Sequence, residues 1–435
     1  LMGPRRVGKT VLLHHCVRQL IADHVPPGNI CYVSVDHPLY NNLRLSEMLE
    51  HFKAASADFD ENRPRYIIFD EIQYLRDWER ELKILVDESE GTRFVASGSA
   101  AAALKLQSSE SGAGRFTDFL LPPLTFHEYL MLTGAMGLVN EEPSALDPQR
   151  FFTTDSIGDL NEKFIAYLNF GGYPEIALSD SLQVDPTRFM KSDVIDKVLL
   201  RDLPTLYGIH DTQELNSLFT TLAYNTANEV SLSELSQNSG VDKKTLKRYI
   251  EYLEAAFLVK VVHRVYQDGQ RFKRARQFKV YLTNPSLRSA LFAPIDADAK
   301  PIGGLAETAV FSQWFHTDHP LYYGRWKSGE VDIISLGPTQ PEWAVEVKWS
   351  DRYVDKPGEL RSLVDFCTQH DIDDIVATSR SVTRDVTVDN QIIRFIPTAL
   401  YCLTVGFNLT SQPPKGTNKP AGTDQTLFDK STDEE

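Results

Sequence analysis

The sequence predicts an α/β protein that begins with a doubly wound parallel sheet and continues through a helical region into a second, smaller α/β domain. Three observations lead to this prediction. Short apolar strands alternate with amphipathic helices over the first part of the chain. A helix, a glycine and a second helix follow one another near residue 240. Strands that end in charged residues lie beyond residue 320. The length of 435 residues is enough for two or three domains.

The composition excludes several classes of protein. Hydrophobic residues make up 42% of the chain, which is enough for packed cores. No run reaches the length of about 18 apolar residues that a membrane span needs, and no secretory signal is visible. The net charge of −15 argues against a protein that is basic overall, although it allows a local basic patch. The four scattered cysteines lack metal-ligand spacing and suit a reducing cytoplasm.

A phosphate-binding motif opens the chain. The pattern G-x-x-x-x-G-K-[ST] is matched in full at the start of a helix-compatible run. Its glycines let the backbone wrap around a phosphate, its lysine supplies a charge for the β- and γ-phosphates, and its threonine supplies a hydroxyl for Mg²⁺. We therefore predict a nucleotide site with Mg²⁺, and the alternative is a glycine-rich turn that fits by chance. The matching residues are Gly3, Pro4, Arg5, Arg6, Val7, Gly8, Lys9 and Thr10.

The segment before this motif is short. A phosphate-binding loop normally follows a buried strand, yet only Leu1 and Met2 precede Gly3. Residue 1 is also not an initiator methionine. We therefore expect a chain that is truncated at its N-terminus and lacks the first strand of the domain.

Further strands of this domain end in polar residues. An apolar strand at 65–69 ends in Asp70 and Glu71. In enzymes with such a loop, the first acid holds Mg²⁺ and the second activates the attacking water, whereas the alternative is a helix cap with a first-turn acid. A later strand ends in Ser97 and Ser99, which either sense the γ-phosphate or form a plain turn. The expected strands and helices alternate in the order 29–36, 45–59, 65–71, 74–88 and 92–99.

The order of these motifs resembles a large prokaryotic family of AAA-type ATPases. The similarity continues through Gly114-Arg115-Phe116, the run 121–130 and the segment 171–175. It implies an AAA-type P-loop ATPase domain over residues 1–180, with ATP as the nucleotide, followed by an uncharacterised C-terminal domain. Enzymes of this type often use an arginine, usually from a neighbouring subunit, on the transferring phosphoryl group. Arg115 is our candidate, with a homo-oligomer as the setting, and the alternative is a surface arginine paired with a nearby acid.

Residues 181–300 predict a helical linker followed by a winged helix. The segment 230–241 predicts a short helix and a glycine turn, and 242–254 predicts a second helix with a polar, basic start. A strand from residue 257 would begin the wing. Basic residues on the second helix and in the wing suit DNA or RNA phosphates, and the alternatives are a protein-docking module or a solvated hairpin. These residues are Lys243, Lys244, Lys247, Arg248, Arg271, Lys273, Arg274, Arg276 and Lys279.

A group of acids and one lysine lies in the small α/β domain expected at 301–408. Glu307 falls on a helix, Asp332 on a strand, and Glu346 and Lys348 on the next strand. Because strand side chains alternate, Glu346 and Lys348 project from the same face. Carboxylates can hold a divalent metal, and a lysine can orient or activate water.

This arrangement resembles the PD-(D/E)xK nuclease-like superfamily. The resemblance implies a metal site formed by Glu307, Asp332 and Glu346, with Glu346 and Lys348 as catalytic residues. The alternative is a domain that keeps these acids to bind DNA or a partner without cutting. The polar and acidic segment 409–435 predicts a disordered tail.

These patterns together predict a cytoplasmic protein that binds and hydrolyses ATP and thereby moves a winged helix and a nuclease-like domain on DNA, with no membrane partner. The rival hypothesis is a nucleotide-gated switch for protein partners, in which the nuclease-like domain is an inactive scaffold. A basic groove beside Glu346 would favour the first hypothesis, and a neutral or apolar groove would favour the second.

Overall fold

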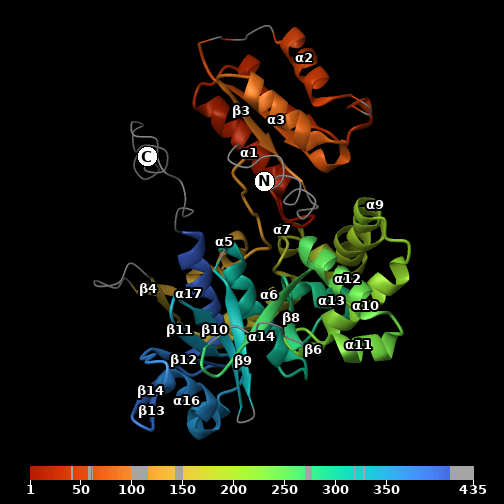
Figure 1. The fold of residues 1–435 in the computed structure, drawn as a ribbon. Coiled ribbons are helices and arrows are strands. Elements are labelled where there is room, and N and C mark those ends of the chain that lie inside the picture. Colours follow the sequence, from red (N-terminus) through yellow and green to blue (C-terminus); the bar gives the residue numbers. More distant parts are fainter. Residues whose placement is uncertain are drawn as a thin grey trace, which may run out of the picture.

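The computed structural model describes residues 1–40, 43–56, 60, 62–98, 116–142, 150–269, 277–317, 319–326 and 329–411. Figure 1 shows an N-terminal domain above a larger body that contains the remaining helices and a long sheet. Within the described ranges, no helix is both long enough and apolar enough to cross a membrane.

The sheet of the N-terminal domain is parallel, as the sequence predicts. β2 (Arg65–Asp70) lies between β1 (Ile30–Ser34) and β3 (Thr92–Ala96). The apolar residues Ile67 and Phe69 of β2 are fully buried. Burial on both faces explains why the strand is a continuous run of β-branched and aromatic side chains.

Met2 extends this sheet beyond β3. Its backbone forms parallel bridges with Gly98 on one side and with Leu120 on the other, and backbone hydrogen bonds of 2.7 Å join it to the chain around Leu120. Gly98 follows β3, so one strand separates Met2 from the strand that carries Asp70. Because these strands are parallel, the phosphate-binding loop and Asp70 lie at the same carboxyl edge of the sheet.

Three helices accompany this sheet. α1 (Lys9–Ala22) follows the phosphate-binding loop, and α2 (Leu45–Ala55) packs against α3 (Trp78–Glu88). The buried faces of α2 and α3 share one hydrophobic core with the strands. Their contributing residues are Leu45, Met48, Leu49, Trp78, Leu82 and Leu85.

The chain after the N-terminal sheet packs with the far end of the sequence. α5 (Phe126–Leu132) and α6 (Ile157–Phe170) share a core with α14 (Ile302–Gln313) and α17 (Thr398–Thr410). This part of the expected range 1–180 therefore lies in the larger body. Shorter elements of the same stretch are β4 (Asn140–Glu142), β5 (Phe151–Thr153), α7 (Pro174–Ala177) and α8 (Asp180–Val184).

A helical segment with wide, π-type turns follows, at the place where the sequence predicts an amphipathic connecting helix. It consists of Thr187–Asp196 and Val198–Asp202 and continues into α9 (Leu203–Tyr207). We call residues 187–202 the linking helix. Most of its apolar side chains are buried, as their spacing predicts, but Leu200, which the same spacing includes, is exposed. The buried side chains are Met190, Val194, Ile195, Val198 and Leu199.

The expected helix, turn and helix are present. α11 (Leu232–Ser239) ends at Gly240, which has a left-handed backbone with φ +75°, and α12 (Lys243–Ala255) follows. The Asp242 side chain caps α12 by accepting hydrogen bonds from two backbone N–H groups of the first turn. β7 (Val259–Val265) then pairs antiparallel with β8 (Gln277–Leu282). The winged-helix class remains a prediction, and residues 270–276, with most of the expected basic wing, lie outside the described ranges.

A nine-stranded sheet runs through the larger body in the order β13-β14-β12-β11-β10-β9-β7-β8-β6. β9 (Leu321–Trp326) pairs parallel with β7 and antiparallel with β10 (Gly329–Leu336). The sheet therefore continues across residue 300, where we expected a domain boundary. The remaining elements are α10 (Thr212–Tyr224), β6 (Glu229–Ser231), α13 (Ser286–Phe292), β11 (Pro341–Glu346), α15 (Arg352–Asp355), β12 (Ile375–Ser379), β13 (Arg384–Val388) and β14 (Gln391–Pro397).

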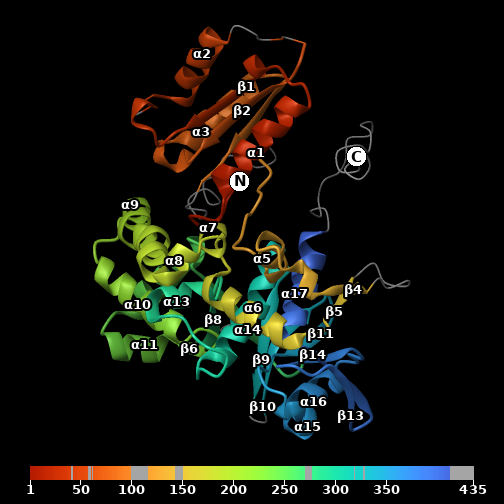
Figure 2. The same ribbon diagram turned by 180° about the vertical axis from the view of Figure 1, so that it is seen from behind.

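Separate hydrophobic cores cover the two faces of this sheet. Ile333 packs with α14 and α17, whereas the next residue, Ile334, packs with α16 (Arg361–Gln369) on the opposite face. Figure 2 shows α14 and α17 beside the strands from behind. Because α17 continues to Thr410, the first two residues of the expected tail are helical, while 412–435 lie outside the described ranges.

Candidate functional site

The loop between Met2 and α1 has a backbone that depends on its glycines. A Cβ atom at Gly3 would lie 2.2 Å from the carbonyl oxygen of Leu121, and Gly8 has φ +101°. Gly8 is also the residue just before α1, where no side chain caps the first N–H groups and the first turn contains no acid. Uncapped N–H groups at a helix start attract anions, so this loop is suited to a phosphate.

Lys9 is buried inside the loop. Its side chain is only 4% exposed, and its ammonium group donates hydrogen bonds to the carbonyl oxygens of Gly3 at 3.1 Å and Pro4 at 2.8 Å. Burial lowers the pKa of Lys9 to about 8, although Glu71 and Asp70 oppose this shift. The ammonium group therefore lacks a full countercharge, which a nucleotide phosphate would supply.

Asp70 stands at the centre of a set of hydroxyl donors. Its carboxylate accepts hydrogen bonds from Thr10 at 2.7 Å, from Tyr32 at 2.8 Å and from Ser97. The residue is 1% exposed. A carboxylate next to a threonine hydroxyl provides the hard oxygen ligands that Mg²⁺ prefers. Thr10 and Asp70 therefore fit the ion, which would neutralise charge on a bound triphosphate.

Glu71 and Ser97 flank Asp70. Glu71 has a left-handed backbone with φ +56° and accepts a hydrogen bond from the Gln73 side chain. Ser97 is fully buried, and its hydroxyl bonds both to Asp70 and to the backbone N–H of Glu71. Ser97 therefore fixes the Asp70 carboxylate and the backbone of Glu71. Its expected role as a γ-phosphate sensor stays a prediction, and the other two expected residues, Ser99 and Arg115, lie outside the described ranges.

The two arginines of the loop bind carboxylates of the larger body, which the sequence did not predict. Arg5 forms a bidentate pair with Asp202, with distances of 2.6 and 2.8 Å. Arg6 pairs with Asp193 at 2.7 Å and with Glu175 at 3.2 Å. Figures 1 and 2 show the start of α1 close to α7, which carries Glu175. The loop therefore forms part of the contact between the two bodies.

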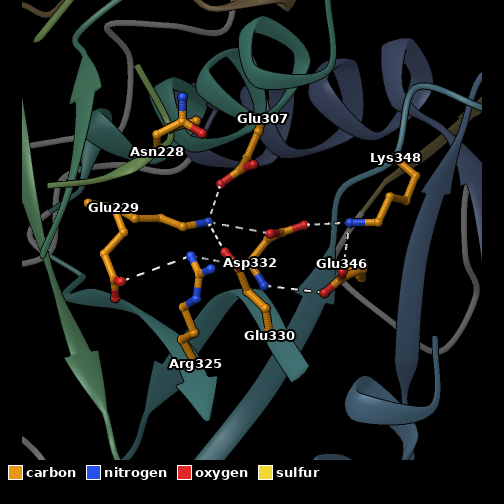
Figure 3. Close-up of a pocket in the computed structure, with 10 residues that line it drawn as sticks. Asn228, Glu229, Glu307, Arg325, Glu330, Asp332, Glu346 and Lys348 are labelled. Atoms are coloured by element: carbon orange, nitrogen blue, oxygen red, sulfur yellow. Dashed lines mark hydrogen bonds and ion pairs between the residues drawn. The ribbon is translucent and has the colours of Figure 1, made fainter. Parts of the chain in front are cut away.

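A second group of charged residues lines a pocket of about 360 Å³ in the nine-stranded sheet. Figure 3 shows that Glu307, Asp332, Glu346 and Lys348 converge there, as the sequence predicts. Lys348 binds Glu346 at 2.6 Å and Asp332 at 3.1 Å. Burial and the neighbouring Asp332 carboxylate raise the pKa of Glu346 to about 8.

Lys279 occupies the centre of this charge cluster. Its ammonium group lies 2.8 Å from Glu307, 2.6 Å from Glu330 and 3.4 Å from Asp332, and its side chain is 2% exposed. The expectation that Lys279 belongs to an exposed basic wing is therefore wrong. The sequence signal was available, because a single lysine stands among the apolar residues of β8.

The carboxylates do not fit a metal ion in this arrangement. Across the described ranges, no group of three or more acidic, histidine or cysteine side chains has geometry for a metal. Lys279 places its ammonium group where the ion would compete for Glu307 and Asp332. The pocket is also neither basic nor apolar, because five acids face three cations. The acids are Glu229, Glu307, Glu330, Asp332 and Glu346, and the cations are Lys279, Arg325 and Lys348.

The fold and the first site together have the features of a nucleotide-binding domain with a phosphate-binding loop. Comparison with known families agrees, because residues 1–130 match a family described as an AAA domain. Residues 161–299 match a family described as a domain of unknown function. The first match supports an AAA-type ATPase domain at the N-terminus.

Most of this chain is similar in sequence to proteins that are themselves uncharacterised. One from Methanocaldococcus jannaschii is 22% identical over 371 residues, which cover 83% of this chain and 77% of the relative. A second from the same organism is 27% identical, covering 80% and 74%. A protein from Haemophilus influenzae is 23% identical, covering 77% and 78%. The sequence similarity therefore spans most of this chain and most of each relative.

Proposed function

We propose that the protein binds and hydrolyses MgATP and that its nucleotide state controls the position of the larger body. The observation that carries this proposal is the convergence of Lys9, Thr10, Asp70 and Glu71 at the carboxyl edge of one parallel sheet. Nucleotides bind at this edge in open α/β sheets.

Each residue has a distinct role in this proposal. Lys9 and the first N–H groups of α1 bind the β- and γ-phosphates. Thr10 and Asp70 hold Mg²⁺, which supplies charge neutralisation when bound. Glu71 accepts the proton of the attacking water. Ser97 holds the Asp70 carboxylate and the backbone N–H of Glu71 in place.

Control of the larger body follows from the ion pairs of the loop. Arg5 and Arg6 are part of the phosphate-binding loop, yet their partners Asp202 and Asp193 lie on the linking helix. A triphosphate that enters the loop attracts the same guanidinium groups. Nucleotide binding therefore changes the strength of these pairs and, with it, the position of the linking helix.

The test is phosphate release from ATP by the whole chain, measured with and without double-stranded DNA. Hydrolysis that requires Mg²⁺ and is lost in Lys9→Ala is the expected result. A chain that neither binds nor hydrolyses ATP would overturn the proposal.

Action on DNA is a second candidate function, favoured by the convergence of Glu307, Asp332, Glu346 and Lys348. It predicts that DNA raises the rate of ATP hydrolysis and that Lys348→Ala removes any cutting of DNA. The acidic pocket and the bound Lys279 instead suit a scaffold. Intact DNA together with unchanged hydrolysis would therefore favour the switch for protein partners.

A further inference from the structure

A second pocket, of about 560 Å³, lies beside the phosphate-binding loop. Its charged side chains are Arg5, Asp36, Lys197 and Arg201. Arg5 is paired with Asp202 and Lys197 with Asp193, whereas no ion pair joins Arg201 to an acid in the described part of the chain. A cation without an acidic partner attracts an anion. The pocket is therefore suited to a phosphate group.

The position of this pocket places it next to the catalytic acids. Arg5 belongs to the loop itself, and Tyr74 lies three residues beyond Glu71. Asp36 follows β1, which is the strand adjacent to β2. All of these residues lie beyond the carboxyl ends of the strands, where the terminal phosphate of a nucleotide in the loop would point.

The linking helix presents Lys197 and Arg201 to the pocket in a fixed orientation. Asp193, four residues before Lys197, binds both Lys197 at 2.6 Å and Arg6 at 2.7 Å. Asp202, next to Arg201, holds Arg5. These pairs anchor both ends of the segment 193–202 to the loop.

Arg201 itself has no acid to neutralise it. Its guanidinium group lies 5.5 Å from the centre of the Tyr74 ring, and no ion pair joins it to any acid in the described part of the chain. The Tyr74 hydroxyl in turn accepts a 2.8 Å hydrogen bond from Arg5. An aromatic ring thus holds the exposed guanidinium at the pocket beside the loop.

We propose that Arg201, assisted by Lys197, contacts the terminal phosphate of ATP bound in the same chain. This inference rests on the proposed ATPase function and names a catalytic arginine for it. In the reaction, the water oxygen bonds to the γ-phosphorus while the bond from that phosphorus to the bridging oxygen breaks. Glu71 receives the water proton and ADP leaves with the bridging oxygen. Arg201 neutralises the charge that develops on the transferred group.

The experiment compares Arg201→Ala with wild type, using Arg188→Ala as the control. Arg188 is an exposed arginine on the same linking helix and does not line the pocket. Binding of ATP and of ADP is measured by calorimetry, and phosphate release is measured at saturating ATP. Thermal unfolding confirms that each variant is folded.

Arg201→Ala is expected to lower kcat by about 100-fold and to weaken ATP binding while ADP binding stays unchanged. Arg188→Ala should match wild type in all three measurements. Normal turnover in Arg201→Ala, or equal losses of ATP and ADP affinity, would overturn the inference. If Lys9→Ala weakens ATP binding in the same experiments, the proposed function stands in either case. Nucleotide binding that does not depend on Lys9 would overturn both.

Discussion

Two buried lysines in this protein have opposite surroundings. Lys9 contacts two backbone carbonyls, and burial lowers its pKa to about 8. Burial also acts on Lys279, but Glu307 and its other neighbours raise the pKa of Lys279 well above the ordinary value. The charge of Lys279 is therefore already neutralised within the protein, whereas Lys9 is ready for an anionic ligand.

Lys9→Ala removes the charge that the proposal assigns to the β- and γ-phosphates. We expect ATP affinity to fall by about 10- to 100-fold, since hydrogen bonds to charged groups contribute about 1.5–3 kcal/mol. Calorimetric titration with ATP measures the change. The control is Lys53→Ala, because Lys53 is exposed on α2. Equal affinities in Lys9→Ala and Lys53→Ala would contradict the assignment.

Glu71→Gln keeps the size of the side chain but removes its basicity. We expect ATP binding to be retained and turnover to fall by about 100- to 10,000-fold, which is the usual contribution of a general base. Parallel measurements of binding and phosphate release separate the two effects. Turnover at the wild-type rate would remove Glu71 as the base.

Lys279→Met leaves the surrounding acids without their central cation. We expect the free energy of unfolding to fall by about 3–5 kcal/mol, because uncompensated buried charge is costly. Adding Glu307→Gln should restore part of the loss, since Glu307 lies 2.8 Å from the missing ammonium. Urea unfolding of both variants checks this, and a fully stable Lys279→Met would show that the cluster contributes little.

At the scale of elements, the linking helix connects the two bodies through its acids. The partners Arg5 and Asp202 are partly buried, with side chains that are 16% and 11% exposed. Such bidentate pairs are stronger and more directional than exposed ion pairs. A nucleotide phosphate that attracts Arg5 must therefore work against this pair.

Asp202→Asn weakens that pair and frees Arg5. We expect ATP affinity to rise by about 3- to 10-fold, because Arg5 then reaches the phosphate without losing a charged partner. Asp180→Asn serves as the control, since Asp180 is an exposed acid on α8. Titration with ATP measures both, and a lower affinity in Asp202→Asn would show that the pair instead holds the loop in its binding conformation.

Sequence patterns predicted the helices and strands better than the ion pairs between residues that are distant in the sequence. The phosphate-binding loop, β2 with its two acids, and the α11 and α12 pair are local patterns and are present. The partners of Arg5 and Lys279 are not local: Asp202 lies 197 residues from Arg5, and Glu307 meets Lys279 only because α14 packs against β8. Ion pairs of this kind depend on packing between elements, which periodicity does not encode.

For the whole molecule, the continuous sheet predicts that the helix-turn-helix region cannot fold without the strands after residue 300. A chain that ends at residue 298 loses β9 and leaves the edge of β7 unpaired. We expect loss of cooperative unfolding and increased binding of a hydrophobic dye, compared with a chain that ends at residue 411. Cooperative unfolding of the shorter chain would instead support a boundary at 300.

The contact between the linking helix and α13 has a mechanical consequence. Residues 187–196 pack against α13, and the buried corner at Thr283 and Asn284 joins α13 to β8, which carries Lys279. A helix and a strand that are joined by a short, buried corner move together as a rigid unit. A displacement of the loop arginines on ATP binding would therefore be transmitted through the linking helix, α13 and β8 to the charge cluster around Lys279. We expect the two sites to be mechanically coupled.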